Sequence, residues 1–489
     1  MSPSSRRCPI SKHAAERPDT LALVAPQETW TYAAFDEAVR RTVVRFRDSG
    51  VSAGTRMALY GRQSEAQITV LAALARIGAV VAPLSHRLPT KRILAACERI
   101  DADGICTSER KLEEAARQSD LPVWSIPDQI AAPDSLERTA SDAASTSDEA
   151  HIRLDRPATL IFTSGSSGAP KAALHTWGHH RASAQGSATN VPLAPGDRWL
   201  LSLPLYHVGG LAILVRCARA GATVVVPSPQ ASLADALARH AITHVSLVPT
   251  QLRRVLRVTN TPPPSLKGVL LGGAALPPDL ISDALDAGWP LHTTYGCTEM
   301  ASQIATTPPG AHRDTLLHTA GSVLSHVELR IAPNREILVR GASLFSGYVT
   351  DSGLDPARTD DGWYRTGDIG GLDDAGHLHV KGRADRMFIS GGENIHPEEV
   401  EAALQRLDDV AHAVVVPVPD PEFGQRPVAF VQMDSAPPVL PQLRHALDAL
   451  LPRFKHPVAL FPFPAPAVDG AMKFSYHDLE KEARNLLRE

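Results

Sequence analysis

The segment Thr163-Ser164-Gly165-Ser166-Ser167-Gly168-Ala169-Pro170-Lys171 follows directly on the apolar run Ala158–Phe162, which is typical of a buried strand. Gly165 and Gly168 allow backbone conformations in which successive amide groups converge on one anion. Lys171 adds a positive charge. Hydroxyl donors come from Thr163, Ser164, Ser166 and Ser167. The order G-x-x-G-x-x-K lacks the G-K-[ST] of a Walker A loop, but it predicts a phosphate-binding loop. A flexible Ser/Gly surface loop is the alternative for this stretch alone.

The composition indicates a globular protein with several folding units. A chain of 489 residues exceeds a single hydrophobic core and predicts roughly three units. Its 49 basic and 53 acidic residues give a net charge of −4, which argues against a nucleic-acid partner. The five cysteines are scattered without metal-binding spacing, and the first residues contain no apolar signal segment. Because no apolar run reaches membrane-spanning length, we expect a soluble cytoplasmic protein without membrane insertion.

Strand-like and helix-like segments alternate through the first half of the chain. Apolar residues recur at helical spacing in Tyr32–Asp48 and Ser64–Ile77, whereas Arg56–Tyr60 and Gly78–Pro83 are typical of strands. This alternation predicts an α/β fold with a large N-terminal domain of parallel sheets. Residues 127–157 are polar and predict a long loop, and a helix is expected at residues 175–188.

The last third of the sequence has a different character. Short strands such as Glu336–Arg340 predict a β-rich subdomain. Pro397, followed by Glu398 and Glu399, is typical of a helix start. Strands at 413–416 and 428–431 and a helix at 440–451 complete the expected small α+β unit.

Several candidate segments follow predicted strands. They are the phosphate-binding loop, His207, Gly272–Gly273 and Tyr295–Gly296. Ligands of parallel sheets bind beyond the carboxyl ends of the strands, where these segments lie. Their shared position predicts one common site.

Two further motifs carry groups that suit a nucleotide. Tyr295-Gly296-Cys297-Thr298-Glu299 combines an aromatic ring that can stack on a base with a carboxylate that can hold magnesium. The segments Tyr364–Asp368 and Gly382–Arg383 supply a carboxylate for ribose hydroxyls and a cation for phosphate. Taken alone, each motif is equally compatible with a structural turn.

Taken together and in this order, the motifs resemble those of the adenylate-forming superfamily, which includes acyl- and aryl-CoA synthetases, luciferases and peptide-synthetase adenylation domains. The resemblance covers residues 14–479. It implies that the loop Thr163–Lys171 holds the phosphates of ATP. It places Tyr295 against adenine and assigns Gly273 and Thr294 to the nucleotide site.

The same resemblance implies roles for charged residues. Thr298 reaches phosphate, Glu299 binds Mg²⁺, Asp368 binds the ribose hydroxyls and Arg383 contacts the nucleotide. Lys473 matches the lysine that stabilises the charge developing during adenylation. The motif around it, Gly470-Ala-Met-Lys-Phe-Ser, departs from the Ser-Gly-Lys that many members have.

The resemblance also implies two domains and two half-reactions. Residues 1–383 form the domain for ATP and the acyl substrate, and residues 384–489 form a mobile domain with its hinge at Asp385. Rotation about the hinge removes Lys473 and brings Gly391 and Gly392 toward the acyl group, where coenzyme A enters. Members are often homodimers, so a homodimer is expected without a recognisable interface.

Within the superfamily, the chain resembles the o-succinylbenzoate–CoA ligases of menaquinone synthesis. The residues that carry this resemblance are Leu203–Leu211, Arg216 and Thr294–Gln303. It implies ATP-dependent conversion of 2-succinylbenzoate to its CoA thioester, with release of AMP and pyrophosphate. The second carboxylate of this substrate needs polar partners because an unpaired buried charge is costly. We predict Arg216, Ser302 and Gln303 for that role; for Arg216 the alternative is a surface helix residue.

Histidines occur at two places of interest. His207 is expected at the wall of the acyl pocket near the reacting carboxylate, and Gly272 is also assigned to the substrate. His175, His179 and His180 lack a supporting carboxylate pattern, so we interpret them as helix-surface residues rather than metal ligands.

Three alternatives remain at this point. One is another aryl- or acyl-CoA ligase, for benzoate or a fatty acid. The second is a stand-alone adenylation enzyme that loads a carrier protein; no acid near His207 suits an amino-acid substrate. The third is a nucleotide-binding regulatory protein without chemistry, against which the joint presence of Glu299, Asp368, Arg383 and Lys473 argues.

Overall fold

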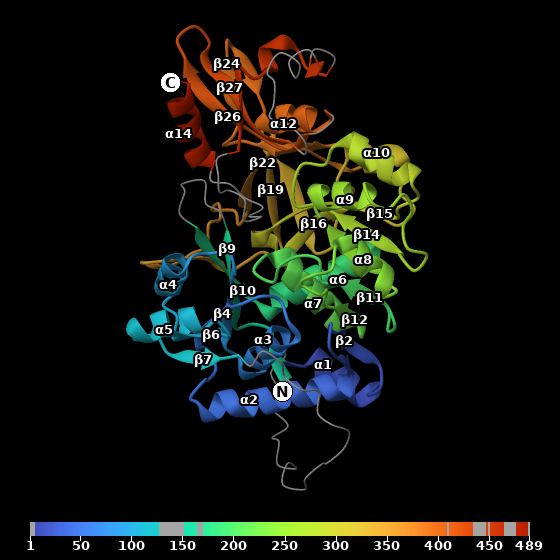
Figure 1. The fold of residues 1–489 in the computed structure, drawn as a ribbon, viewed down its shortest axis with the longest axis vertical. Coiled ribbons are helices and arrows are strands. Elements are labelled where there is room, and N and C mark those ends of the chain that lie inside the picture. Colours follow the sequence, from blue (N-terminus) through green and yellow to red (C-terminus); the bar gives the residue numbers. More distant parts are fainter. Residues whose placement is uncertain are drawn as a thin grey trace.

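Alternating strands and helices build two large sheets in the N-terminal part of the chain, and a smaller unit follows them (Figure 1). This computed structural model describes residues 5–126, 151–163, 170–407, 410–433, 446–447, 450–463 and 476–487. It confirms the predicted α/β class, with large sheets first and a small unit last.

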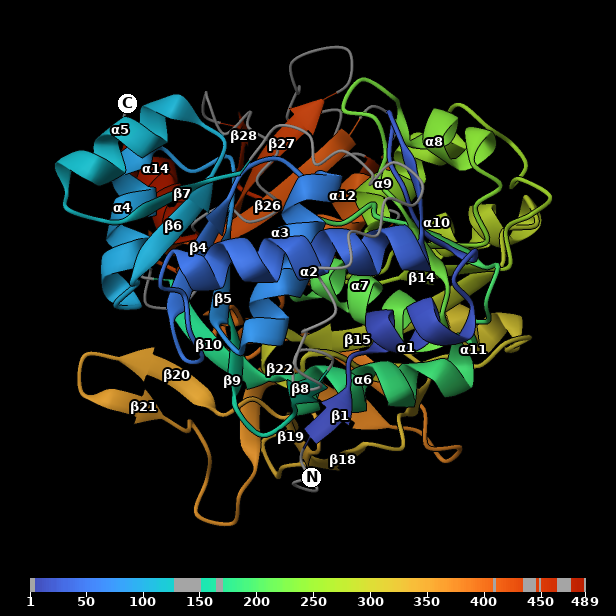
Figure 2. The ribbon, with the colours of Figure 1, turned by 90° about the horizontal axis from the view of Figure 1, so that it is seen from below.

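The first sheet has eight strands within the described ranges. In spatial order they are β21 (Gly353–Asp355), β20 (Gly347–Thr350), β10 (Lys171–Thr176), β9 (Pro157–Thr163), β5 (Val80–Leu84), β4 (Arg56–Tyr60), β6 (Gly104–Thr107) and β7 (Val123–Ser125). The strands from β9 to β7 are parallel, whereas β10, β20 and β21 add an antiparallel edge. The hairpin of β20 and β21 projects from the body of the molecule (Figure 2).

The second sheet has nine strands in the same ranges. In order they are β17 (Ser322–Val323), β16 (Ser302–Thr306), β15 (Leu291–Cys297), β14 (Gly268–Leu271), β13 (His244–Leu247), β11 (Arg198–Leu200), β12 (Thr223–Val225), β2 (Leu21–Val24) and β3 (Thr29–Thr31). Its centre, from β15 to β2, is parallel, as the alternation of strands and helices predicts.

Helices α2 (Tyr32–Asp48) and α3 (Glu65–Ile77) begin where the sequence supplies capping hydroxyls. The side chain of Thr31 accepts the N–H of Ala34, and Ser64 caps α3 in the same way. With α7 (Val208–Ala220), they contribute to a hydrophobic core that also contains residues of both large sheets. The helices therefore fix the two sheets relative to each other.

Other helices cover the sheets or connect their strands. They are α1 (Pro9–Glu16), α4 (Thr90–Arg99), α5 (Arg110–Gln118), α6 (Trp177–Asn190), α8 (Leu233–Arg239), α9 (Pro249–Leu256), α10 (Pro278–Asp286) and α11 (Arg313–His318).

The predicted β-rich part is a four-stranded antiparallel sheet. Its strands are β18 (Val327–Ile331), β19 (Glu336–Gly341), β22 (Tyr364–Leu372) and β23 (Leu378–Arg383). The C-terminal unit follows, with a core of its own. Its elements are β24 (Phe388–Ser390), β25 (Glu393–Ile395), α12 (Pro397–Gln405), β26 (Val410–Asp420), β27 (Gly424–Met433), β28 (Ala459–Pro462) and α14 (Tyr476–Leu486).

Near the phosphate-binding loop, the helix expected at residues 175–188 is present as α6, with shifted bounds, whereas the interpretation of His175 and His180 as helix-surface residues is wrong. Residues 171–176 form strand β10, paired with β9, and the helix begins only at Trp177. Thr176 caps it: its hydroxyl accepts the N–H of His179, whose ring accepts the N–H of Thr176. His175 and His180 are buried rather than on a helix surface. Burial lowers the pKa of His180 to about 3 and keeps both rings neutral.

Part of the expected polar loop is also a strand. Residues 151–153 form β8, which pairs with β1 (Ser5–Arg7). Residues 127–150 and most of the expected helix at 440–451 lie outside the described residues.

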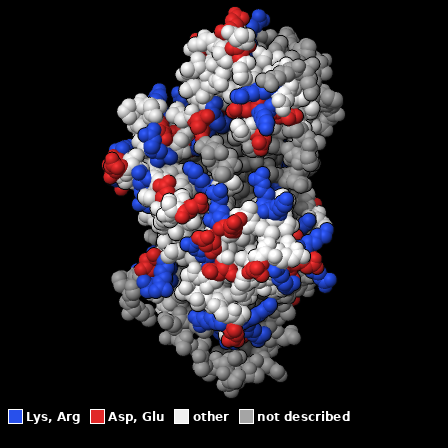
Figure 3. All heavy atoms as spheres, turned by 90° about the vertical axis from the view of Figure 1, so that its left-hand side faces the viewer, with Lys and Arg blue, Asp and Glu red and all other residues white. Residues whose placement is uncertain are grey.

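The surface shows mixed charge. Acidic and basic side chains are interspersed on the face shown in Figure 3, in keeping with the small net charge of −4. In the part of the chain that the structure describes, no helix has the length and apolar character needed to cross a membrane.

Candidate active site

A cleft of 2840 Å³ lies where the parallel strands of the second sheet end and where the β-rich sheet and the C-terminal unit approach. It brings together most of the predicted site residues. Those that line it are Thr163, Lys171, His207, Arg216, Gly272, Gly273, Thr294, Tyr295, Thr298, Glu299, Ser302, Gln303, Asp368, Arg383 and Asp385. Gly391 and Gly392 are not among the lining residues; they are exposed at the turn between β24 and β25.

Other predicted residues cannot be placed. Ser164, Gly165, Ser166, Ser167, Gly168 and Lys473 lie outside the described residues, so their roles stay predictions.

Two glycines allow the close backbone contacts that shape the cleft. A Cβ atom on Gly296 would lie 1.8 Å from the carbonyl oxygen of Ser302, and one on Gly272 would lie 2.6 Å from the Thr294 side chain. Any other residue would push β15 away from its neighbours. A register shift between Tyr295 and Gly296 then turns the chain into the short helix Thr298–Met300, which carries Glu299.

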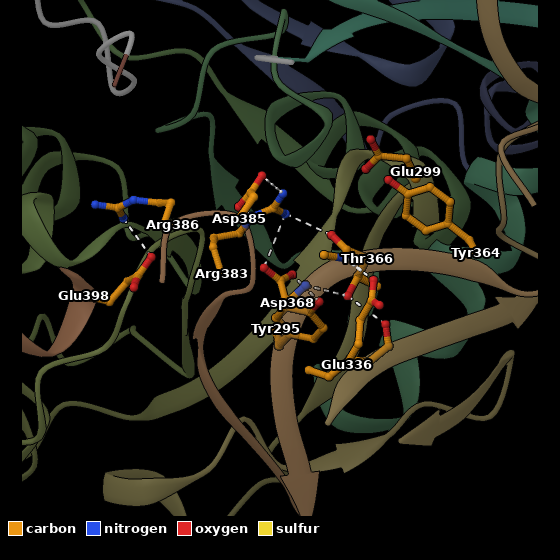
Figure 4. Close-up of polar contacts among 12 residues, drawn as sticks. Tyr295, Glu299, Glu336, Tyr364, Thr366, Asp368, Arg383, Asp385, Arg386 and Glu398 are labelled. Atoms are coloured by element: carbon orange, nitrogen blue, oxygen red, sulfur yellow. Dashed lines mark hydrogen bonds and ion pairs between the residues drawn. The ribbon is translucent and has the colours of Figure 1, made fainter. Parts of the chain in front are cut away.

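Asp368 lies at the centre of an ionic network (Figure 4). Tyr295 Oη donates to Asp368 Oδ2 at 2.5 Å, and Arg383 Nη1 lies 3.4 Å from Oδ1. Arg383 also donates to both carboxylate oxygens of Asp385, at 3.0 and 2.9 Å. Burial raises the pKa of Asp368, against the opposing effects of Tyr295 and Arg383. The predicted ribose carboxylate is therefore tied directly to the predicted nucleotide arginine and through it to the predicted hinge residue.

Glu299 lies in a different environment, beside Tyr364 in Figure 4. Its side chain is 8% exposed, and its Oε1 accepts a hydrogen bond of 2.5 Å from Tyr348 Oη. Tyr364 Oη lies 3.0 Å from Tyr348 Oη. No Lys or Arg of the described ranges forms an ion pair with Glu299. A buried carboxylate without a cation is a suitable ligand for a divalent metal ion.

Arg216 also lines the cleft, and it lies on α7. Its guanidinium is 3% exposed; Nη2 donates to Gln303 Oε1 at 2.7 Å and to Ser302 Oγ at 3.3 Å. It lies 5.3 Å from the ring centre of Trp199, and its Nε has no partner within the described ranges. Burial lowers the pKa of Arg216 to about 10, which leaves it charged at neutral pH.

His207 and Lys171 also line the cleft. His207 is half-buried at the start of α7, next to the ring of Tyr206. Lys171 Nζ lies 5.0 Å from the ring centre of Tyr348. The cleft thus holds a buried guanidinium, a histidine, a lysine and two carboxylates.

Sequence reasoning missed Tyr348 and Trp199. Tyr348 reaches the site because β20 pairs with β10, which places it opposite Ala173, far away in sequence. No local pattern reports such a pairing. Trp199 lies in β11, and its aromatic side chain is the one signal in the sequence that points to it.

Comparisons with known proteins agree with this geometry. Residues 10–349 match the family model described as AMP-binding enzyme, and residues 399–465 match that of the AMP-binding enzyme C-terminal domain. The chain is 34% identical to a 2-succinylbenzoate–CoA ligase of Bacillus cereus, covering 90% of this chain and 91% of that protein. A ligase of the same name from Salmonella typhimurium is 42% identical over 67% of this chain and 69% of its own length.

Solved structures of the same kind are similar throughout. The o-succinylbenzoate CoA synthetase of Bacillus subtilis, in complex with its acyl-adenylate intermediate, superimposes with a TM-score of 0.86 at 29% identity, covering 97% of this chain and 98% of that chain. A structure of the synthetase from the same organism with ATP and a magnesium ion gives a TM-score of 0.82 at 29% identity, covering 94% and 96%.

Proposed function

The chain belongs to the AMP-binding enzyme family, and we propose that it ligates 2-succinylbenzoate to coenzyme A through an acyl-adenylate, releasing AMP and pyrophosphate. As an acid–thiol ligase it uses ATP, Mg²⁺ and coenzyme A. The observation that carries the choice of substrate is the buried guanidinium of Arg216, which lines the cleft without a carboxylate partner in the described ranges.

Arg216 is suited to the second carboxylate of the substrate. Burying a cation without a partner anion costs on the order of several kcal/mol of free energy, so binding of a ligand that supplies the anion is favoured. Gln303 and Ser302 both bind Nη2 of the guanidinium, whereas its Nε has no hydrogen-bond partner in the described ranges. A planar guanidinium binds a carboxylate with two parallel hydrogen bonds. A monocarboxylic acid would leave this cation unpaired.

The nucleotide is proposed to lie between Tyr295 and Asp368 at one end and Lys171 at the other. Asp368 accepts hydrogen bonds, which suits ribose hydroxyls, and Arg383 beside it can neutralise phosphate. Glu299 fits a metal ion because it is buried without a cation, and it would hold Mg²⁺. When bound, Mg²⁺ supplies positive charge against the phosphates.

Adenylation then needs alignment more than covalent help. The substrate carboxylate attacks the α-phosphate, and the bond to pyrophosphate breaks. His207 at the wall of the acyl pocket and Lys171 near the phosphates hold the two reactants. We assign the stabilisation of the developing charge to Lys473 and the loop 163–171.

The second half-reaction is proposed to follow a rotation about Asp385. Gly391 and Gly392 are exposed and do not line the cleft. This fits a segment that enters the cleft only after the rotation. The thiol of coenzyme A then attacks the acyl carbonyl and AMP leaves. The division at residues 383 and 384, a cytoplasmic location and a homodimer belong to the same proposal.

The test is AMP formation that depends on coenzyme A, with ATP and Mg²⁺, across 2-succinylbenzoate, benzoate, a medium-chain fatty acid and an amino acid. We expect a strong preference for 2-succinylbenzoate. Preference for benzoate or a fatty acid would overturn the substrate and keep the reaction. AMP formation without thioester would point to a carrier protein as acceptor, and activity with none of the acids would contradict the proposal.

A further inference from the structure

The carboxylate of Glu299 is held by a cluster of aromatic side chains. Tyr348 Oη donates to its Oε1 at 2.5 Å, and Tyr364 Oη lies 3.0 Å behind Tyr348 Oη. Phe345 packs edge-on against both tyrosine rings, with centroids 4.8 and 5.5 Å apart. The backbone N–H of Phe345 donates to the carbonyl of Glu299 at 2.7 Å. Both the main chain and the side chain of Glu299 are therefore fixed from the β20 side.

We propose that Tyr348 is the positioning residue of the metal-binding carboxylate, an inference that rests on the function proposed above. A hydrogen bond to one carboxylate oxygen restricts the rotation of the group and leaves further lone pairs for a metal ion. A tyrosine hydroxyl is a donor and a carboxylate oxygen accepts, so Tyr348 Oη donates to Glu299 Oε1.

The ring and the hydroxyl of Tyr348 have separate contacts. The ring lies 5.0 Å from Lys171 Nζ, in the cation–π range, whereas the hydroxyl contacts Glu299. A phenylalanine keeps the ring and its packing on Phe345 and removes only the donor. Tyr348→Phe thus isolates the effect on the carboxylate.

The readout is metal affinity rather than turnover. Free Mn²⁺ is measured by electron paramagnetic resonance while Mn²⁺ is added to the full-length protein with ATP, and ATP binding is measured separately in EDTA. We expect Tyr348→Phe to raise the Kd for Mn²⁺ about tenfold, since loss of a group that orients a ligand has this size of effect. ATP affinity in EDTA should change less than twofold.

Tyr32→Phe is the matched control. Tyr32 is also buried, donates to the carbonyl of Ala222 at 2.9 Å and does not line the cleft. Tyr32→Phe should lower the free energy of unfolding without any change in the Kd for Mn²⁺. A double-mutant cycle with Glu299→Gln completes the design: once the carboxylate is gone, Tyr348→Phe should change Mn²⁺ affinity less than twofold.

An unchanged Kd for Mn²⁺ in folded Tyr348→Phe, or equal effects with and without Glu299, would overturn the inference. If the phenylalanine variant does not fold, Tyr348→Met takes its place; because methionine also removes the ring contact with Lys171, only its coupling to Glu299→Gln in the double-mutant cycle tests the inference. Failure of the proposed function is recognised independently, because then the native protein itself would form no thioester or would not bind Mn²⁺ with ATP.

Discussion

Arg76 on α3 and Arg216 on α7 are both buried guanidinium groups, 7% and 3% exposed, but their partners differ. Arg76 forms an ion pair with Asp36 on α2, whereas no carboxylate of the described ranges pairs with Arg216. Burial tends to lower the pKa of Arg76, and its contacts with Cys8 and Asp36 reverse this and raise it. For Arg216, burial prevails and the pKa falls to about 10. One cation is neutralised within the fold, and the other is neutralised only when a ligand brings an anion.

The largest expected effect comes from giving Arg216 a carboxylate partner, as Arg76 has in Asp36. Gln303→Glu would place a carboxylate where Gln303 Oε1 now lies, 2.7 Å from Arg216 Nη2. The new carboxylate neutralises the cation and repels the substrate's second carboxylate. We expect kcat/KM for 2-succinylbenzoate to fall about a thousandfold, or about 4 kcal/mol, while the free energy of unfolding rises. Steady-state kinetics and urea unfolding measure both; retained activity would show that the second carboxylate binds elsewhere.

The Arg216 region also contains a histidine that burial keeps uncharged. His244 stacks on Trp199, the ring that Arg216 covers, and burial lowers its pKa to about 4, with Asp197 raising it and Lys267 and His292 lowering it. His244 therefore becomes protonated at a lower pH in the folded protein than in the unfolded protein, in which its pKa is about 6.5. Stability from this group is complete above pH 6.5 and is lost as the pH falls toward 4.

The measurement is urea unfolding of the native protein and His244→Gln between pH 7.5 and 4. The advantage of the native protein should shrink by about 3 kcal/mol over this range, since 2.5 pKa units correspond to about that free energy. A constant difference between the two proteins would contradict a neutral buried His244.

The opposite change removes the carboxylate partner of Arg76. Asp36→Asn would leave that guanidinium buried without its carboxylate. We expect the free energy of unfolding to fall by about 2–3 kcal/mol, at the lower end for a broken buried pair because Asp36 is 27% exposed. The KM for 2-succinylbenzoate should change less than twofold, because neither residue lines the cleft. A raised KM would mean that the Arg76 pair also shapes the acyl site.

The smallest effect concerns the weaker contact of Arg216. Its bond to Ser302 Oγ is long, at 3.3 Å, so Ser302→Ala should raise the KM for the diacid about fivefold, near 1 kcal/mol. Saturation kinetics with the diacid measure this change. If neither this variant nor Arg216→Ala changes KM, Arg216 and Ser302 do not bind the substrate.

The contrast between the two arginines also shows what the sequence could predict. Arg216 is predicted from the resemblance that it carries together with Leu203–Leu211 and Thr294–Gln303, and the segment Ser64–Ile77, which contains Arg76, is correctly predicted as helical. The pairing of Arg76 with Asp36 could not be predicted, because it depends on how α2 packs against α3. Whether a buried charge is satisfied is decided by tertiary packing, which periodicity does not report.

The same limit explains the errors around the phosphate-binding loop. The strands before and after it pair with each other, and this pairing extends β10 to Thr176, so the helix expected from His175 begins at Trp177. Pairing of β10 with β20 also brings Tyr348 to Glu299. The motif residues Glu299 and Asp368 are predicted from short motifs and from the family resemblance. Tyr348, which contacts Glu299, comes from a distant segment. Tyr295, which contacts Asp368, is predicted instead to lie against adenine.

The most direct test of the account compares two acids and two proteins. The ratio of kcat/KM for 2-succinylbenzoate to that for a monocarboxylic analogue is measured in the native chain and in Arg216→Met; the analogue is whichever of 2-butanoylbenzoate and 4-oxo-4-phenylbutanoate forms a thioester, since each keeps one of the two carboxylates. We expect a native ratio of about a hundred or more, since a charged hydrogen-bonded pair contributes about 3 kcal/mol, and a ratio near one in the variant. The variant should remain folded because methionine removes a buried charge. An unchanged ratio would contradict the claim that Arg216 recognises the diacid.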